Sequence, residues 1–307
     1  MKIKNTIFAS KPEEKVFRSL ESRWSPQFRL WPSLPLSTLF KLEDNDVTEK
    51  ERQYFYSTSI DYTLCDSGNT PLLSIEFDGI GGGFSNNGIY LPGDGYVNSM
   101  RKVKLDFKLK CAAEVGFPLF VVSYEEIESL DQDDTLMILD GIIGQVLAKK
   151  EFFRKINDLN DYYHDKFAEA SSLEEYELKQ EVIQDLATSC EVEAELTMDP
   201  IARKAADYGE LCHGLGVGSY SMRNLSDPAL PDFNGIDDIE GLKARIEAMK
   251  HTVREGCQIT IEMPGQKIEK TVWVRNFESY GVSASSIARN IAEYLGFKKA
   301  YSLLPKM

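Results

Sequence analysis

Alternating apolar and polar residues predict a β-hairpin in the first third of the chain. Residues 54–64 and 71–78 have the pattern of two strands, joined by a two-residue turn at Gly68 and Asn69. The period of two puts the apolar side chains on one face, which we expect to be the packed face: Ile60, Tyr62, Leu64, Leu73, Ile75 and Phe77. The opposite face carries the polar side chains: Ser59, Asp61, Thr63, Ser74, Glu76 and Asp78.

Helical periodicity flanks this hairpin on both sides. Ser10 has the form of a helix cap before a predicted helix over 12–23. A second helix is expected over 98–115, ended by Gly116, and the short apolar run 117–122 fits a buried parallel strand. Because strand, helix and buried strand follow one another, the pattern indicates a crossover unit and an α/β fold.

The second half of the chain is expected to be more helical. The patterns predict helices over 134–170, 173–188, 239–251 and 283–295 and a hairpin over 257–263 and 268–274. Three prolines mark 26–35 as an extended connection, scattered glycines and prolines mark 199–235 as irregular, and Gly296 is expected to end the last helix. We expect three parts: an α/β domain at 1–133, an acidic helical segment at 134–198 and a small α/β module at 199–307.

Charge is distributed unevenly along the 307 residues. The net charge is -14, from 35 basic and 49 acidic residues, and residues 151–200 alone hold 4 basic and 14 acidic residues. The acidic total argues against a nucleic-acid partner, which usually requires a basic surface. A local basic cluster argues the other way: Arg101, Lys102, Lys104, Lys108 and Lys110.

Cysteine, histidine and hydropathy patterns exclude several classes. The five cysteines and three histidines are scattered, so neither a disulfide framework nor a zinc site is indicated. No apolar run reaches the ~20 residues of a membrane span, and the first residues lack the apolar core of a secretion signal. We therefore expect a cytoplasmic protein without a membrane partner.

The polar face of the hairpin is the strongest chemical signal. In the predicted register Asp61 lies directly opposite Glu76, and like charges in such a pair are destabilising. A divalent metal or the basic helix that follows would compensate them. The alternative is an ordinary amphipathic hairpin with a solvated acidic face. Lys104 and Lys108 are four residues apart and share a helix face with Arg101.

These residues resemble a known family. The chain has Asp61 on one strand, Ile-Glu76-Phe-Asp78-Gly on the next, and then a basic helix and a strand that starts at Gly116-Phe-Pro. This order of motifs is similar to that of the PD-(D/E)XK nuclease superfamily, and more narrowly to that of the branch of very-short-patch-repair endonucleases. The resemblance covers about residues 12–125 and implies a restriction-endonuclease-like mixed sheet flanked by helices. Asp78 stands where the family's best-known motif has lysine, which implies that Lys104 or Lys108 supplies the positive group.

The resemblance also implies roles for individual residues. Asp61 and Glu76 would ligate Mg²⁺ or Mn²⁺, and Asp78 would ligate the same ion or a second one. Glu14, or its neighbour Glu13, would be an auxiliary acid on the first helix. Four basic residues would contact nucleic acid: Arg101, Lys102, Lys104 and Lys108.

Three functional hypotheses remain open on the sequence. The first is a metal-dependent nuclease acting on DNA rather than RNA, in defence or repair, whose C-terminal half binds a protein partner or a second copy. The second is a catalytically inactive protein of the same fold that binds nucleic acid or protein. The third is an interaction protein built on the acidic helices, which would bind no metal.

Overall fold

The protein is a mixed α/β chain with two separate β-sheets. The computed structural model describes residues 8, 10–42, 47–78, 96–123, 126, 136–168, 171–217, 219–230, 239–277 and 280–304, with backbone alone at 96–98 and 160–168. The chain forms two compact units: unit 1 comprises 1–139, 225–256 and 273–285, and unit 2 comprises 140–224, 257–272 and 286–307. Among the described residues, no helix has the length and apolar character needed to span a membrane.

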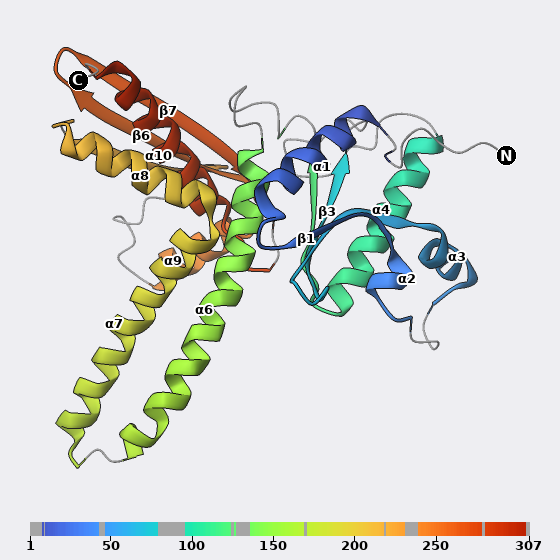
Figure 1. Ribbon diagram of the computed structural model, residues 1–307, viewed down its shortest axis with the longest axis horizontal. Coiled ribbons are helices and arrows are strands. Elements are labelled where there is room, and N and C mark those ends of the chain that lie inside the picture. The colour runs from blue at the N-terminus through green and yellow to red at the C-terminus, as the bar shows by residue number, and fades with distance from the viewer. Residues whose placement is uncertain are drawn as a thin grey trace. The chain divides into compact units, whose positions relative to one another are not determined.

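Unit 1 is built on a four-stranded sheet of order β1-β2-β3-β4 (Figure 1). Its strands are β1 (Arg29–Pro35), β2 (Ser59–Cys65), β3 (Pro71–Asp78) and β4 (Leu119–Ser123). The first three strands are antiparallel neighbours, and β4 pairs parallel to β3 after the helix α4 (Tyr96–Glu114). The predicted crossover unit is therefore confirmed. Gly116 follows α4 with φ of 63°, a conformation that favours glycine.

Two predictions in this unit were wrong. The region expected to be an extended connection contains β1, an edge strand, where proline costs little because one side of the backbone needs no partner. Residues 54–57, expected to begin β2, instead end the helix α3 (Glu49–Ser57). Thr48 and Glu51 form a capping box at its start, with Glu51 accepting from the Thr48 backbone N–H at 2.8 Å. The short helix α2 (Leu36–Leu39) precedes it.

The hairpin register agrees with the prediction although the turn differs. Tyr62 pairs with Ile75, as in the predicted register, so the next position along places Asp61 opposite Glu76. The turn is longer than expected: the Asp66 N–H donates to the Thr70 carbonyl at 3.0 Å, closing a three-residue loop. A bulge between Leu64 and Cys65 shifts the strand by one residue and restores the register.

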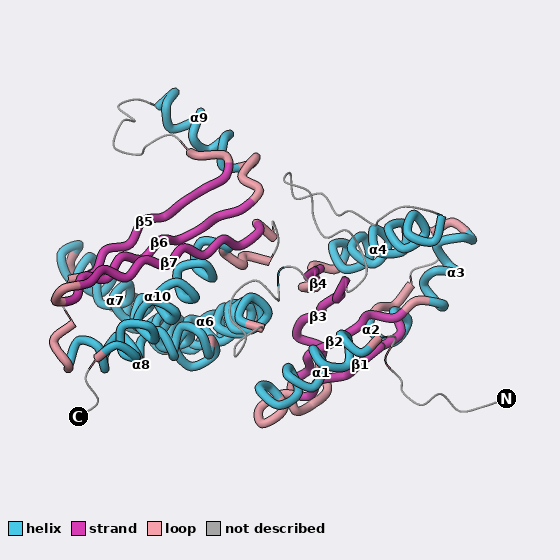
Figure 2. The backbone as a smooth tube through the Cα atoms, turned by 90° about the horizontal axis from the view of Figure 1, so that it is seen from above, coloured by secondary structure: helices cyan, strands magenta, loops and turns pink. Residues whose placement is uncertain are grey.

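Helices cover both faces of the first sheet (Figure 2). On one face, the Tyr62 hydroxyl donates to the Glu13 carbonyl of α1 (Lys11–Trp24) at 2.7 Å. On the other face, α4 packs over the polar side of the hairpin, and Thr63 and Ser74 are fully buried, with their hydroxyls 2.8 Å apart. The face expected to be polar is thus mostly interior, and its hydroxyls satisfy each other.

Unit 2 contains a helical hairpin and most of the second sheet. The remaining elements of the chain are α6 (Met137–Ala168), α7 (Leu173–Met198), α8 (Pro200–Gly214), β5 (Tyr220–Asp227), α9 (Ile239–Met249), β6 (Arg254–Met263), β7 (Gln266–Arg275) and α10 (Ala284–Leu303). Helix α9 belongs to unit 1, and the other elements lie wholly or mostly in unit 2. The antiparallel sheet has the order β5-β6-β7. Helices α6 and α7 run side by side (Figure 1). Lys155 of α6 pairs with Glu193 of α7 at 2.7 Å.

Two predictions in the second half were also wrong. Helix α8 and strand β5 occupy much of the segment expected to be irregular, because Asp199 caps α8 and Pro200 begins it. Gly296 does not end the last helix but lies inside α10. A β-carbon there would come within 2.8 Å of Ile259, so glycine lets α10 approach β6 closely.

Candidate functional site

A cavity of about 500 Å³ in unit 1 collects most of the candidate residues. It lies at the ends of β2 and β3, beside α1 and α4. The charged side chains lining it are Glu13, Asp61, Glu76, Asp78, Arg101, Lys104 and Lys108. Residues from four elements, separated by up to 95 positions in sequence, therefore face one space.

Asp61 is held in place by the neighbouring strand. Its Oδ2 accepts the backbone N–H of Phe77 at 2.8 Å. Burial and then the charge of Glu76 raise the pKa of Asp61 well above its ordinary value, while Lys108 and the Phe77 N–H oppose that rise. The ionised pair of acids is costly in this environment, so the cavity favours additional positive charge beside Asp61.

Glu76 forms a buried ion pair with Lys108. The Lys108 Nζ donates to both Glu76 carboxylate oxygens, at 2.8 and 2.7 Å. The two side chains are only 12% and 11% exposed. Burial raises the pKa of Glu76, and Lys108 limits the rise by favouring the charged carboxylate. Of the two lysines proposed from the sequence, Lys108 is the one placed against the carboxylates.

The other basic residues divide into two groups. Lys104 and Arg101 line the cavity, and the Lys104 ammonium lies 5.9 Å from the centre of the Tyr54 ring, a cation–π distance. Lys102 lies outside the cavity lining and pairs with Asp106 at 2.7 Å on the exposed side of α4. Arg101 and Lys104 are thus the residues that could meet a substrate phosphate at the cavity.

The first helix contributes Glu13 rather than Glu14. Glu13 is 6% exposed and lines the cavity, whereas Glu14 projects outward, 3.9 Å from Arg18. The sequence carried a signal that separates them: Glu13 shares the helix face of Val16, Phe17 and Leu20. Of the two acids considered on the first helix, Glu13 is therefore the one that lies at the cavity, and Glu14 is not. Ser57 and Thr58 at the rim of the cavity were not foreseen, because they lie at the end of the unpredicted helix α3, whereas Ser59 was predicted on the polar face.

The donor set fits Mg²⁺ better than a metal that needs many protein ligands. Within the described residues, no group of three or more His, Cys, Asp or Glu is arranged to hold a metal. Mg²⁺ commonly takes only one or two carboxylates and keeps several waters. Asp61 and Glu76 supply that number of hard oxygen ligands at one edge of a roomy polar cavity.

Residues 79–95, which follow β3 and are rich in glycine and asparagine, lie outside the described residues. Comparison of the chain with protein-family models, with curated proteins and with solved structures returned no match.

Proposed function

We propose that unit 1 is a metal-dependent nuclease of the PD-(D/E)XK type, with a restriction-endonuclease-like fold, that hydrolyses phosphodiester bonds in nucleic acid. The observation that carries this proposal is the shared cavity of Asp61, Glu76 and Lys108, with Lys108 held against Glu76. DNA is the proposed substrate, because the sequence motifs resemble those of DNA repair endonucleases.

Asp61 and Glu76 would hold Mg²⁺ or Mn²⁺, and Asp78 lies at the same edge as a further ligand. Such an ion lowers the pKa of a bound water and stabilises charge on a phosphate. The protein's own residues do the rest. Lys108 brings a positive charge next to the acids, where charge develops on the phosphoryl oxygens. The Phe77 N–H fixes the direction of the Asp61 carboxylate.

Arg101 and Lys104 would contact the substrate backbone at the mouth of the cavity. Both lie on α4, with Arg101 two turns and Lys104 one turn before Lys108. Contacts of this kind orient a strand without reading its sequence. Glu13, on the α1 side, would orient water and exclude the substrate from that edge.

The experiment is a substrate panel with matched variants. Supercoiled plasmid, linear duplex, single-stranded DNA and RNA are incubated with the full chain in Mg²⁺, Mn²⁺ or EDTA. We expect cleavage in either metal and none in EDTA, and a loss of at least about 100-fold in Glu76→Gln. The control is Glu114→Gln, an exposed acid at the end of α4, which should cleave like wild type.

A second candidate function is an inactive nuclease fold that binds nucleic acid or protein. The observation favouring it is Asp78 in the place of the motif lysine, together with a Glu76 already neutralised by Lys108. In the same panel this candidate predicts nucleic-acid or protein binding without cleavage in any metal.

The rest of the chain, outside unit 1, has no proposed role in cleavage. The C-terminal half would provide targeting or assembly through a protein partner or a second copy, and the protein would act in the cytoplasm.

A further inference from the structure

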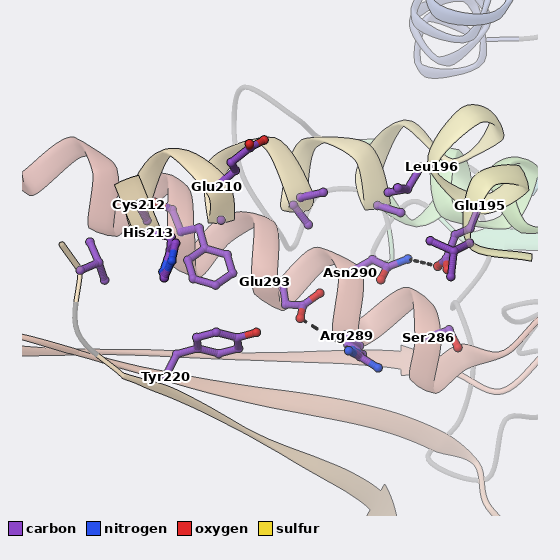
Figure 3. A pocket seen from close by; sticks show the side chains of 17 residues that line it. Glu195, Leu196, Glu210, Cys212, His213, Tyr220, Ser286, Arg289, Asn290 and Glu293 are labelled. Carbon is purple, nitrogen blue, oxygen red and sulfur yellow. Dashed lines mark hydrogen bonds and ion pairs between the residues drawn. The ribbon is translucent and has the colours of Figure 1, made fainter. Parts of the chain in front are cut away.

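Unit 2 contains a larger cavity that the nuclease proposal does not use. It measures about 740 Å³ and is lined by α7, α8, α10 and the start of β5 (Figure 3). Cavities of this size with mixed apolar and polar walls are typical of small-molecule sites.

One face of α10 gives the cavity a polar end and an aromatic end. Ser286, Asn290, Glu293 and Phe297 follow one another at spacings of three or four residues and all line it. At a rise of 1.5 Å per residue, this stripe extends for roughly 16 Å. A ligand lying along it would be elongated, with polar and apolar parts in a fixed order.

The aromatic end is formed by two rings from different elements. The Tyr220 and Phe297 rings meet edge to face, with centroids 5.2 Å apart and planes at 80°. On the opposite side, α8 presents small residues, Ala205, Ala206 and Gly209, and the Phe297 ring packs against Gly209, where a β-carbon would lie 3.4 Å from it. This end suits a flat aryl group.

The charged part of the cavity favours a cation. Glu293 is 16% exposed and forms an ion pair at 3.7 Å with Arg289, which is 56% exposed and also lines the cavity. Glu195 faces the same cavity and accepts the Asn290 amide at 3.0 Å (Figure 3). Burial raises the pKa of Glu293, the charge and hydrogen bond of Arg289 oppose that rise, and the charge of Glu195 adds to it. Among the charged side chains that line the cavity, the three acids Glu195, Glu210 and Glu293 outnumber the single arginine, Arg289.

We propose that this cavity binds an arylalkylamine, with its ammonium on Glu293 and its ring against Tyr220 and Phe297. Glu293 and Phe297 are one helical turn apart, so their β-carbons are about 5–6 Å from each other. A two-carbon chain between amine and ring spans that separation. The proposal is independent of the nuclease site.

The test uses the full chain and a fluorinated probe followed by ¹⁹F NMR. 2-(4-Fluorophenyl)ethylamine should bind saturably, and 2-(4-fluorophenyl)ethanol, which lacks the charge, should bind at least about tenfold more weakly. Glu293→Gln should weaken amine binding by a similar factor. Glu191→Gln, an exposed acid of α7 outside the cavity, should leave it unchanged.

Tyr220→Ala provides a second variant, because its ring is 51% exposed and its loss should not prevent folding. It should weaken the amine severalfold while the thermal unfolding midpoint stays near that of wild type. No saturable binding of the amine, equal binding of the alcohol, or full affinity in Tyr220→Ala would overturn the proposal.

Discussion

Lys108 is the residue on which the chemistry of the candidate site depends most. Its ammonium forms an ion pair with the buried Glu76 carboxylate. The Lys104 ammonium instead lies at cation–π distance from the Tyr54 ring. Removing one member of a buried ion pair leaves the other charge without compensation. The two lysines, which the sequence could not separate, should therefore behave differently when replaced.

Lys108→Met keeps most of the unbranched side chain and removes its ammonium group and charge. We expect this change to cost about 3–5 kcal/mol of unfolding free energy and to lower cleavage at least about 100-fold. Lys104→Met should cost less than about 1 kcal/mol and lower cleavage about tenfold. Urea denaturation and plasmid cleavage measure the two effects. Equal losses in both variants would contradict the assignment of Lys108.

Asp199 is a buried acid whose importance the sequence did not reveal. Its Oδ1 accepts the N–H groups of Ile201 and Ala202, at 2.8 and 3.2 Å, and so caps α8. Burial raises its pKa from 3.8 to about 6 despite these bonds. Between pH 4 and 6 the folded state holds more protons than the unfolded chain, so this residue makes stability fall as pH rises through that window.

Asp199→Asn should remove that pH dependence, because asparagine caps a helix but does not titrate. A shift of about two pKa units corresponds to roughly 3 kcal/mol. We expect the free energy of unfolding of the wild type to fall relative to the variant, by up to about that amount, from pH 4 to pH 7. Urea denaturation across this range gives both curves. Parallel curves would show that Asp199 does not cause the pH dependence of the unfolding free energy.

At the scale of elements, helix α6 packs close to the start of α8. A β-carbon at Gly144 would come within 2.7 Å of the Asp199 Cα, which is backbone and cannot rotate away. At Gly214, the last residue of α8, an added β-carbon would meet no other atom within 4 Å. Helix propensity alone would favour alanine at both positions.

Gly144→Ala should therefore destabilise the protein by about 1–3 kcal/mol, since the helices must move apart. Gly214→Ala should change stability by less than about 0.5 kcal/mol. Thermal unfolding of both variants at one pH makes the comparison. A stabilised Gly144→Ala protein would mean that the α6–α8 packing is looser than the structure indicates.

The sequence predicted those elements whose hydrophobic period is uninterrupted. Helix α1, the β3–α4–β4 crossover and the β6–β7 hairpin were recognised because apolar spacing and turn residues agree there. Strand β1 was missed because its prolines resemble a loop, and α8 because glycines follow it closely. The hairpin register was predicted correctly only because a bulge offset the error in the turn.

The candidate site was predictable in its parts but not in its pairings. The strand period placed Asp61, Glu76 and Asp78 together, and the helix period placed Lys104 and Lys108 on one face. The choice of Lys108, and of Glu13 over Glu14, depends on how α4 and α1 pack on the sheet, which involves contacts between distant segments. Cavities formed by several elements, such as the one beside α10, give no local signal.

For the whole molecule, the central contrast is between an acidic chain and a cavity that also presents basic side chains. The net charge of -14 comes largely from residues 151–200, in unit 2, whereas Arg101, Lys104 and Lys108 line the cavity of unit 1. Non-specific binding to nucleic acid should therefore be weak and sensitive to salt. Activity would depend on the local charge at the cavity more than on the total.

The most direct measurement is the rate at which the purified full chain nicks supercoiled plasmid in Mg²⁺, compared with Asp61→Asn. This variant keeps the shape of the side chain and removes one carboxylate. We expect metal-dependent cleavage by the wild type and a loss of at least about 100-fold in Asp61→Asn. Cleavage at the same rate by both proteins, or cleavage that persists in EDTA, would contradict it.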